Sequence, residues 1–198
     1  MVLRGRKETL LNLVRGHSWQ RATEAVSKLL EEHLNELLDR DFLSLIRSLG
    51  RRSFWRHSIE VFDAIRRAQL QPNELHYTAA MRSCTLGGEA AAAAGLRLFA
   101  DLEDPGAMAF TAAISSCGVA KEWELAIDLL NCMIEAEHEP DLLAFNAVLT
   151  VCKRAGKPKL ALRLLRGLRH QQLQPDVMTY SAAISACERV SLWRQSLK

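Results

Sequence analysis

The sequence predicts an all-α solenoid in which hairpins of two helices stack on one another. The composition supports helices in a globular protein, because only 10 of the 198 residues are Gly and 5 are Pro, while 48% are hydrophobic and 25% charged. The sequence also repeats with a period of about 35 residues. Each repeat holds two amphipathic segments that cannot bury their apolar faces alone, so neighbouring repeats are expected to pack together.

Three series of residues share this period. The aromatic series is Phe42, Tyr77, Phe110, Phe145 and Tyr180, with intervals of 35, 33, 35 and 35 residues. The other two are Cys84, Cys117, Cys152 and Cys187, and Pro72, Pro105, Pro140 and Pro175, both with intervals of 33, 35 and 35. The period predicts repeats at 39–73, 74–106 (irregular in length), 107–141 and 142–176, a partial and truncated repeat at 177–198, and a degenerate N-terminal cap at 1–38.

Each repeat resolves into two helices, as residues 142–176 illustrate. Apolar residues follow the i, i+3, i+4, i+7 spacing of an amphipathic helix at Phe145, Val148, Leu149 and Cys152. Pro158 suits the first turn of a second helix, where its missing N–H is not needed. Asp176 is placed to cap the first helix of the next repeat.

Charge is unevenly distributed along the chain. Lys and Arg outnumber Asp and Glu by 13 to 9 in residues 1–73 and by 10 to 2 in residues 142–198, whereas acidic residues lead by 12 to 3 in residues 74–141. A basic C-terminal part is a weak indication of a polyanionic partner.

No motif of catalysis or metal binding is present. The six His form no H-E-x-x-H pattern, the five Cys form no close pairs, and there is no glycine-rich phosphate loop. We therefore expect a protein that is not an enzyme, with no cofactor, metal or small-molecule substrate. No apolar run approaches the roughly 18 residues of a membrane-spanning helix, so we expect no membrane partner.

Two stretches carry a family resemblance. Residues 141–156 are D-L-L-A-F-N-A-V-L-T-V-C-K-R-A-G, and residues 175–187 are P-D-V-M-T-Y-S-A-A-I-S-A-C. Both resemble the pentatricopeptide repeat, whose pattern is roughly P-D-x-x-T-Y-N-x-L-I-x-x-C-x-x-x-G. The resemblance is close over residues 74–198 and loose over 39–73. The sequence A-A-I-S-A-C-E at residues 182–188 is similar to P-class repeats of algae and protists. It implies a right-handed superhelix.

The resemblance also implies binding of single-stranded RNA, one base per repeat, along the first helices. In that family the fifth and last residues of a repeat select the base. Carried over, Thr111 with Asp141 corresponds to the pair for guanine, Asn146 with Asp176 to the pair for uracil, and Ser181 begins a purine-like third reader. Thr78 is also expected to read a base, but its partner Gly106 has no side chain, so discrimination there should be poor. Leu43 with Asn73 matches no pair, because Leu cannot hydrogen-bond a base edge.

Other contacts to RNA follow from the same resemblance. The second residue of each repeat would sandwich bases, and these residues are Leu75, Met108, Leu143 and Met178. Basic residues near the ends of first helices would contact phosphates, and these are Arg82, Lys153, Arg154 and Arg189.

The repeating residues have simpler interpretations beside the functional one. We expect the aromatic series to lie in the core, the Cys series and Cys132 to be small packing residues, and the Trp residues at the start of second helices to be apolar anchors. Thr111 and Asn146 could also be polar residues that bond only locally.

Two functions remain open from the sequence. The first is sequence-selective RNA binding in organellar RNA processing, stability or translation, in the mitochondrion or chloroplast. The second is a structural solenoid that binds proteins, for instance in a ribonucleoprotein such as a mitochondrial ribosome, because only two repeats have a complete pair. The start of the chain is basic but short, with Glu8 close by, so no transit peptide is evident.

Overall fold

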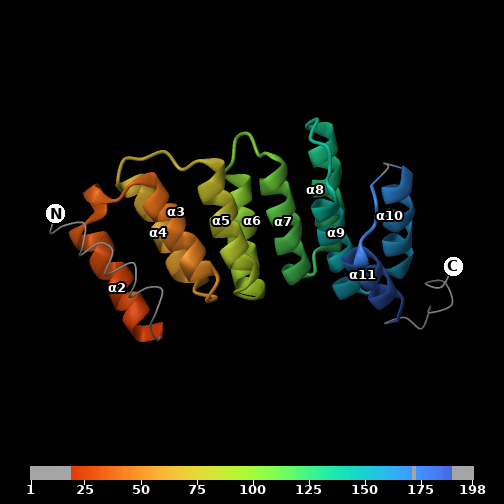
Figure 1. Cartoon of the computed structure of the whole chain (residues 1–198), viewed down its shortest axis with the longest axis horizontal. Coiled ribbons are helices and arrows are strands. Elements are labelled where there is room, and N and C mark those ends of the chain that lie inside the picture. Colours follow the sequence, from red (N-terminus) through yellow and green to blue (C-terminus); the bar gives the residue numbers. More distant parts are fainter. Residues whose placement is uncertain (1–18, 171–172, 189–198) are drawn as a thin grey trace. The chain divides into compact units, whose positions relative to one another are not determined.

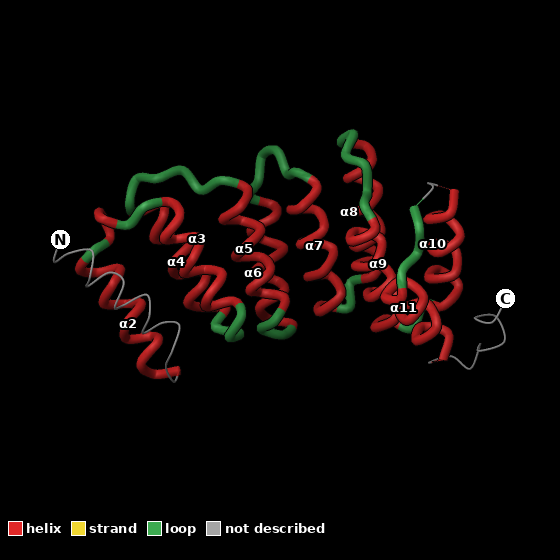
Figure 2. The backbone as a smooth tube through the Cα atoms, viewed as in Figure 1, coloured by secondary structure: helices red, strands yellow, loops and turns green. Residues whose placement is uncertain are grey.

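A computed structural model of the chain describes residues 19–170 and 173–188, and every regular element within these ranges is helical (Figures 1 and 2). The elements are α2 (Trp19–Glu32), the 3-10 helix η1 (Leu34–Glu36), α3 (Asp39–Gly50), α4 (Trp55–Arg67), α5 (Glu74–Thr85), α6 (Glu89–Ala100), α7 (Ala107–Ala120), α8 (Trp123–Glu135), α9 (Leu142–Ala155), α10 (Pro158–His170) and α11 (Val177–Glu188). The predicted all-α fold of repeated helical hairpins is confirmed.

Helix starts coincide with the repeat boundaries expected from the period. First helices begin at Asp39, Glu74, Ala107, Leu142 and Val177. The second helix of each pair follows after a short loop, as α10 follows α9. No helix in the described part of the chain combines the length and apolar character needed to cross a membrane.

The chain divides into two compact units, Met1–Leu98 and Phe99–Lys198. In the first unit, α3 packs on α4 and α5, and α4 packs on α5. Its core includes Phe42, Ile46 and Phe62, all buried. The Phe62 and Tyr77 rings meet edge to face with centroids 4.8 Å apart, and the Arg66 guanidinium donates to the Tyr77 hydroxyl at 3.0 Å. Burial and this bond together hold the first helix of one repeat against the second helix of the previous repeat.

In the second unit, the first helices form a continuous layer. α7 packs on α9 and α9 packs on α11, while α8 and α10 pack against α9. Phe110, Ile114 and Leu149 are buried between these helices. We call α7, α9 and α11 the first-helix layer, and it carries the predicted base-contacting positions of residues 107–188.

The last residue of a repeat caps the next first helix. A side-chain oxygen accepts from the backbone N–H three residues on in three pairs: Asn73 from His76 at 3.2 Å, Asp141 from Ala144 at 2.8 Å, and Asp176 from Thr179 at 2.8 Å. This bond satisfies an N–H that the helix itself leaves unpaired. It also fixes the side chain at the junction between two repeats.

The cysteine series is buried, as expected. Cys84, Cys117 and Cys152 are free thiols, and burial raises their pKa to about 11, about 12 and about 11. Cys187 is also buried, with a raised pKa. Cys132 differs, because it is exposed on α8, so the expectation that it packs was wrong.

The aromatic series is buried at four of its five positions. Phe42, Tyr77, Phe110 and Phe145 lie in the core, whereas Tyr180 on α11 remains 39% exposed. The core prediction is therefore wrong for Tyr180. No further described helix packs on α11 beyond α9 and α10, so part of its surface stays open.

Candidate functional site

The structure brings Asn146 and Asp176 together across a repeat junction. Asn146 is the fifth residue of α9, and Asp176 is the cap of α11. The Asn146 amide Nδ2 donates to Asp176 Oδ1 at 3.3 Å. These two residues were paired on sequence resemblance alone, and 30 residues separate them in the chain. Their side chains thus form one polar group on the first-helix layer.

A third residue, Thr179, completes this group. Its hydroxyl oxygen lies 2.7 Å from Asn146 Oδ1 and 2.7 Å from Asp176 Oδ1, and it accepts from the Asp176 backbone N–H at 3.1 Å. Thr179 is completely buried, whereas Asp176 is exposed. The sequence analysis missed Thr179. The available signal was a hydroxyl residue three positions after a capping Asp, which is a variant of the capping box.

The hydrogen bonds of this group stabilise the charged form of Asp176. The Thr179 hydroxyl is the main cause that lowers the Asp176 pKa, followed by the Thr179 backbone N–H, while burial opposes the shift and the Asn146 amide adds a smaller lowering effect. A carboxylate that accepts several hydrogen bonds stays ionised at lower pH. Asp176 is therefore an acceptor at neutral pH.

The preceding junction is built differently. The Thr111 hydroxyl donates to the Ala107 carbonyl in its own helix at 3.0 Å, and Asp141 makes no hydrogen bond to it. Position 144, which corresponds to Thr179, is an Ala and offers no hydroxyl. No hydrogen bond therefore connects the side chains of the predicted Thr111–Asp141 pair.

At Thr78 the structure contradicts the expectation of a base-contacting residue. The side chain is 3% exposed, and its hydroxyl donates to the Leu75 carbonyl at 3.2 Å. A side chain buried to this degree is not accessible to a base edge. Ser181, by contrast, is exposed on α11.

The four residues expected to sandwich bases are all exposed apolar side chains. Leu75 is 43% exposed, Met108 54%, Leu143 61% and Met178 69%. Each is the second residue of its first helix. Water-exposed Leu and Met at one repeated position are suited to contact an apolar or aromatic surface of a ligand. Their role with RNA stays a prediction.

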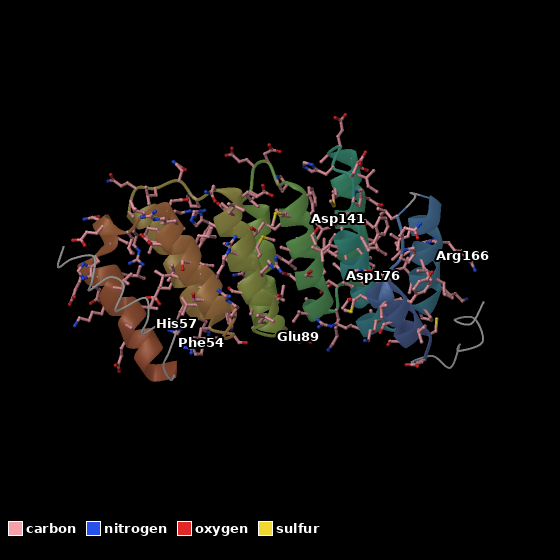
Figure 3. The ribbon with its side chains drawn as sticks, viewed as in Figure 1. Phe54, His57, Glu89, Asp141, Arg166 and Asp176 are labelled. Carbon is pink, nitrogen blue, oxygen red and sulfur yellow. The ribbon has the colours of Figure 1, made fainter. Side chains whose placement is uncertain are left out.

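Basic side chains lie on both kinds of helix. Arg82 and Arg154 are exposed, and Lys153 half-buried, in the last turns of α5 and α9, as expected, whereas Arg189 lies outside the described residues. The sequence analysis overlooked a second basic group on α10. It comprises Lys159, Arg163 and Arg166, all exposed at i, i+4 and i+7 (Arg166 is labelled in Figure 3). Much of the positive charge of residues 142–198 is therefore on a second helix.

The first unit has its own junction chemistry. The buried His76 ring lies at 3.2 Å from the Asp39 carbonyl through Nε2, and its Nδ1 accepts from the Asn73 backbone N–H at 3.4 Å. Asn73 Nδ2 also donates to the Asp39 carboxylate at 3.5 Å. Here the last residue of the repeat contacts the first residue, Asp39, so Leu43 at the fifth position takes no part.

Within residues 19–170 and 173–188, no three His, Cys, Asp or Glu side chains gather so that they could hold a metal ion.

Comparison with known proteins identifies the repeats. A family model for the PPR repeat matches residues 108–138, and one for the pentatricopeptide repeat domain matches residues 128–189. No curated protein matches the chain.

Solved structures share the fold at low sequence identity. The pentatricopeptide repeat protein PPR10, in complex with an 18-nt psaJ RNA element, is 21% identical with a TM-score of 0.71, and the match covers 98% of this chain and 32% of that one. The PPR domain of Arabidopsis thaliana protein-only RNase P 1, in complex with tRNA, is 17% identical with a TM-score of 0.62 and 87% coverage of both chains. Nuclear proteinaceous RNase P 2 from A. thaliana is 16% identical with a TM-score of 0.66, covering 96% of this chain and 41% of that one.

This chain thus spans about a third of the length of PPR10. The sequence period, the helix pairs that begin at each repeat boundary, and both family models agree. Residues 108–189 of this chain match the pentatricopeptide repeat models, and the chain shares its fold with solved pentatricopeptide repeat proteins.

Proposed function

We propose that this chain binds single-stranded RNA along the first-helix layer and selects bases with Thr111, Asn146 and Ser181. The observation that carries this proposal is the hydrogen bond from the Asn146 amide to Asp176 at 3.3 Å, which joins the two residues that the family uses as a pair. Two family members with the same fold, PPR10 and the PPR domain of protein-only RNase P 1, were solved in complex with RNA.

The chemistry of the Asn146 amide suits this role. An amide group has two N–H donors and an oxygen that accepts two hydrogen bonds. Asp176 takes one donor and Thr179 approaches the oxygen at 2.7 Å, so one N–H and one acceptor position remain for a base. A base edge with one donor beside one acceptor, as uracil has, can bond to both.

Neighbouring side chains would supply the other contacts. Leu143 and Met178 are the exposed second residues of the repeat that holds Asn146 and of the repeat after it. Their apolar side chains would flank the base. Lys153 and Arg154 in the last turn of α9 would attract the phosphates. This mode of action is binding, without a catalytic step by this chain.

We place this RNA binding in the mitochondrion or chloroplast, in RNA processing, stability or translation. That part of the proposal rests on where proteins of the pentatricopeptide repeat family usually act. Localisation of the full-length protein with a fluorescent tag tests it, and a purely nuclear or cytosolic signal would contradict it.

The test of RNA binding is a titration with two oligonucleotides of the same composition. One carries a G-U step within cytidines, and the other separates the G from the U. We expect tighter binding of the G-U oligonucleotide, and Asn146→Ala should remove the preference at the U. Asn131→Ala is the matched control, because Asn131 is exposed on the second helix α8 and should leave binding unchanged.

A protein-binding scaffold is the second candidate, and one observation favours it. Thr78 is buried and Leu43 cannot hydrogen-bond a base, so three base-contacting positions remain among the described residues. Stacked bases contribute about 1–3 kcal/mol each whatever their identity, so three contacts give only weak binding that reads little sequence. Equal binding of both oligonucleotides, with no effect of Asn146→Ala, would support the scaffold instead.

A further inference from the structure

Thr179 lies between the two side chains that face the proposed RNA site. Its hydroxyl is 2.7 Å from Asn146 Oδ1 and 2.7 Å from Asp176 Oδ1, and its side chain is completely buried beneath them. It cannot contact a base itself. Any effect it has on RNA must therefore pass through the two residues above it.

The hydrogen-bond inventory of these three groups permits only one orientation of the Asn146 amide. An ionised carboxylate accepts hydrogen bonds and donates none, so the amide group must turn its N–H to Asp176. The amide oxygen then faces the Thr179 hydroxyl, which lies 2.7 Å from both this oxygen and Asp176 Oδ1 and shares its single proton between them. The flipped amide would place its oxygen against the carboxylate oxygen at 3.3 Å, where neither group has a proton to share.

We propose that Thr179 is a positioning residue for base selection, because its hydroxyl bridges the Asn146 amide oxygen and the Asp176 carboxylate and so keeps the carboxylate where it orients the amide. The orientation of the amide determines which donor and acceptor pattern the base meets. The inference rests on the proposed function and adds the residue that sets the specificity of this repeat. It assigns Thr179 no contact with the RNA.

The orientation matters because uracil and cytosine present reversed patterns. Uracil has an N–H donor at N3 beside an acceptor oxygen at C4, whereas cytosine has an acceptor at N3 beside an amino donor at C4. An amide held in one orientation matches the donor and acceptor pattern of only one of these two bases. An amide free to rotate by 180° offers both patterns in turn, and discrimination between the two pyrimidines falls.

The preceding junction provides an internal comparison. Asp141 caps α9 with the same 2.8 Å bond from Ala144 that Asp176 receives from Thr179. Ala144 lacks a hydroxyl, and Thr111 bonds within its own helix instead of to Asp141. Helix capping alone therefore does not join the fifth and last residues. The joined junction differs from this one in its fifth residue, Asn146 in place of Thr111, and in the hydroxyl of Thr179.

The experiment compares Thr179→Val, which keeps the shape but removes the hydroxyl, with Thr179→Ser, which keeps the hydroxyl. Oligonucleotides carry either U or C at the base opposite Asn146 and are otherwise identical. We expect the U-to-C affinity ratio to fall about fivefold in Thr179→Val, the usual effect of losing one hydrogen bond, and to be retained in Thr179→Ser. A thermal melt confirms that each variant is folded. An unchanged ratio in folded Thr179→Val would overturn the inference.

A measurement without RNA separates this inference from the proposed function. Nuclear Overhauser contacts between the Asn146 amide protons and the Asp176 β-protons report the amide orientation in the free protein. We expect them to be strong in the wild type and in Thr179→Ser, and weak in Thr179→Val. If the wild-type protein shows no preference for U, the proposed base selection is wrong. The Overhauser contacts in the RNA-free protein then test by themselves whether Thr179 positions the Asn146 amide. Contacts that persist in Thr179→Val would refute that role.

Discussion

The Trp55 ring lies so close to Gly87 that no side chain fits between them. A β-carbon built on Gly87 would be 2.2 Å from Trp55 Cδ1 and 2.6 Å from the Ala91 β-carbon. Trp55 begins α4, whereas Gly87 is in the loop between α5 and α6. The first residue of one second helix therefore packs against the interhelical loop of the next hairpin.

The same relationship recurs in the second unit. Trp123 begins α8, and the Lys157 ammonium from the loop between α9 and α10 lies 4.2 Å from the centre of its ring. A cation over an indole face is attracted by the ring electrons. Trp55 and Trp123, each at the start of a second helix, thus contact the next repeat as anchors between hairpins. In the second unit that contact includes a charge.

The Gly87 contact predicts a loss of stability on substitution. Gly87→Ala would force the Trp55 ring or α6 to move, because the clash at 2.2 Å is far inside van der Waals distance. We expect a cost of about 1–3 kcal/mol, the usual range for overpacking. Urea unfolding monitored by Trp fluorescence measures it.

Gly167→Ala is the matched control. Gly167 lies inside α10 with no atom within 4 Å of a built β-carbon, so alanine should raise helix stability by about 0.5–1 kcal/mol. Equal effects of the two substitutions would show that the Trp55 contact has no energetic role.

The cysteines should differ sharply in reactivity. Burial raises the pKa of Cys84 and Cys152 to about 11 and that of Cys117 to about 12, so at pH 8 roughly a thousandth or less of each is the reactive thiolate. Cys132 is exposed. We expect one rapidly labelled thiol in the folded protein with an aromatic disulfide reagent.

Cys132→Ser should abolish this rapid phase, and urea should release the remaining thiols. Rapid labelling that survives in Cys132→Ser would mean that a thiol of the buried series opens readily to solvent.

The repeat period predicted the fold well because its causes are local. Apolar spacing marks the helices, and a cap residue such as Asp141 or Asp176 marks where each first helix begins. These signals lie within a few residues of one another. The helix starts at Leu142 and Val177 agree with them.

The candidate site was predictable only in part, because its details depend on contacts between repeats. Asn146 and Asp176 followed from the family pattern, but Thr179 contacts Asn146 from 33 residues away. The burial of Thr78 likewise comes from packing around α5, which the period does not encode. The exposure of Tyr180 has the same origin, since its ring occupies a core position on a helix that is covered less completely.

The titration of Asp176 should depend on Thr179. Its pKa lies below the ordinary value for aspartate, mainly because the Thr179 hydroxyl bonds to the carboxylate. For a carboxyl group with a lowered pKa, the stabilisation is complete above the unfolded-state pKa and is lost as the pH falls through the folded-state value. We expect Thr179→Val to raise the midpoint of the Asp176 carboxyl carbon in an NMR titration.

Thr179→Ser should leave that midpoint where the wild type has it. If Thr179→Val titrates at the wild-type midpoint, the backbone N–H groups alone lower the pKa. The hydroxyl bond to Asp176 would then have no measurable effect on its charge.

The joined junction should be transferable to the repeat before it. Thr111→Asn alone places an amide near Asp141, but without a hydroxyl at position 144 nothing bridges the amide to the carboxylate. Adding Ala144→Thr supplies the missing hydroxyl at the position that Thr179 occupies one repeat later. We expect the base preferred at this repeat to change from guanine to uracil, with a U-to-C affinity ratio about fivefold higher in the double variant than in Thr111→Asn. Binding to oligonucleotides that differ only at this base measures the ratio, and a thermal melt excludes misfolding around the buried position 144. Equal ratios in two folded variants would mean that the hydroxyl does not control the amide, because the same three side chains would then fail to reproduce the same selectivity.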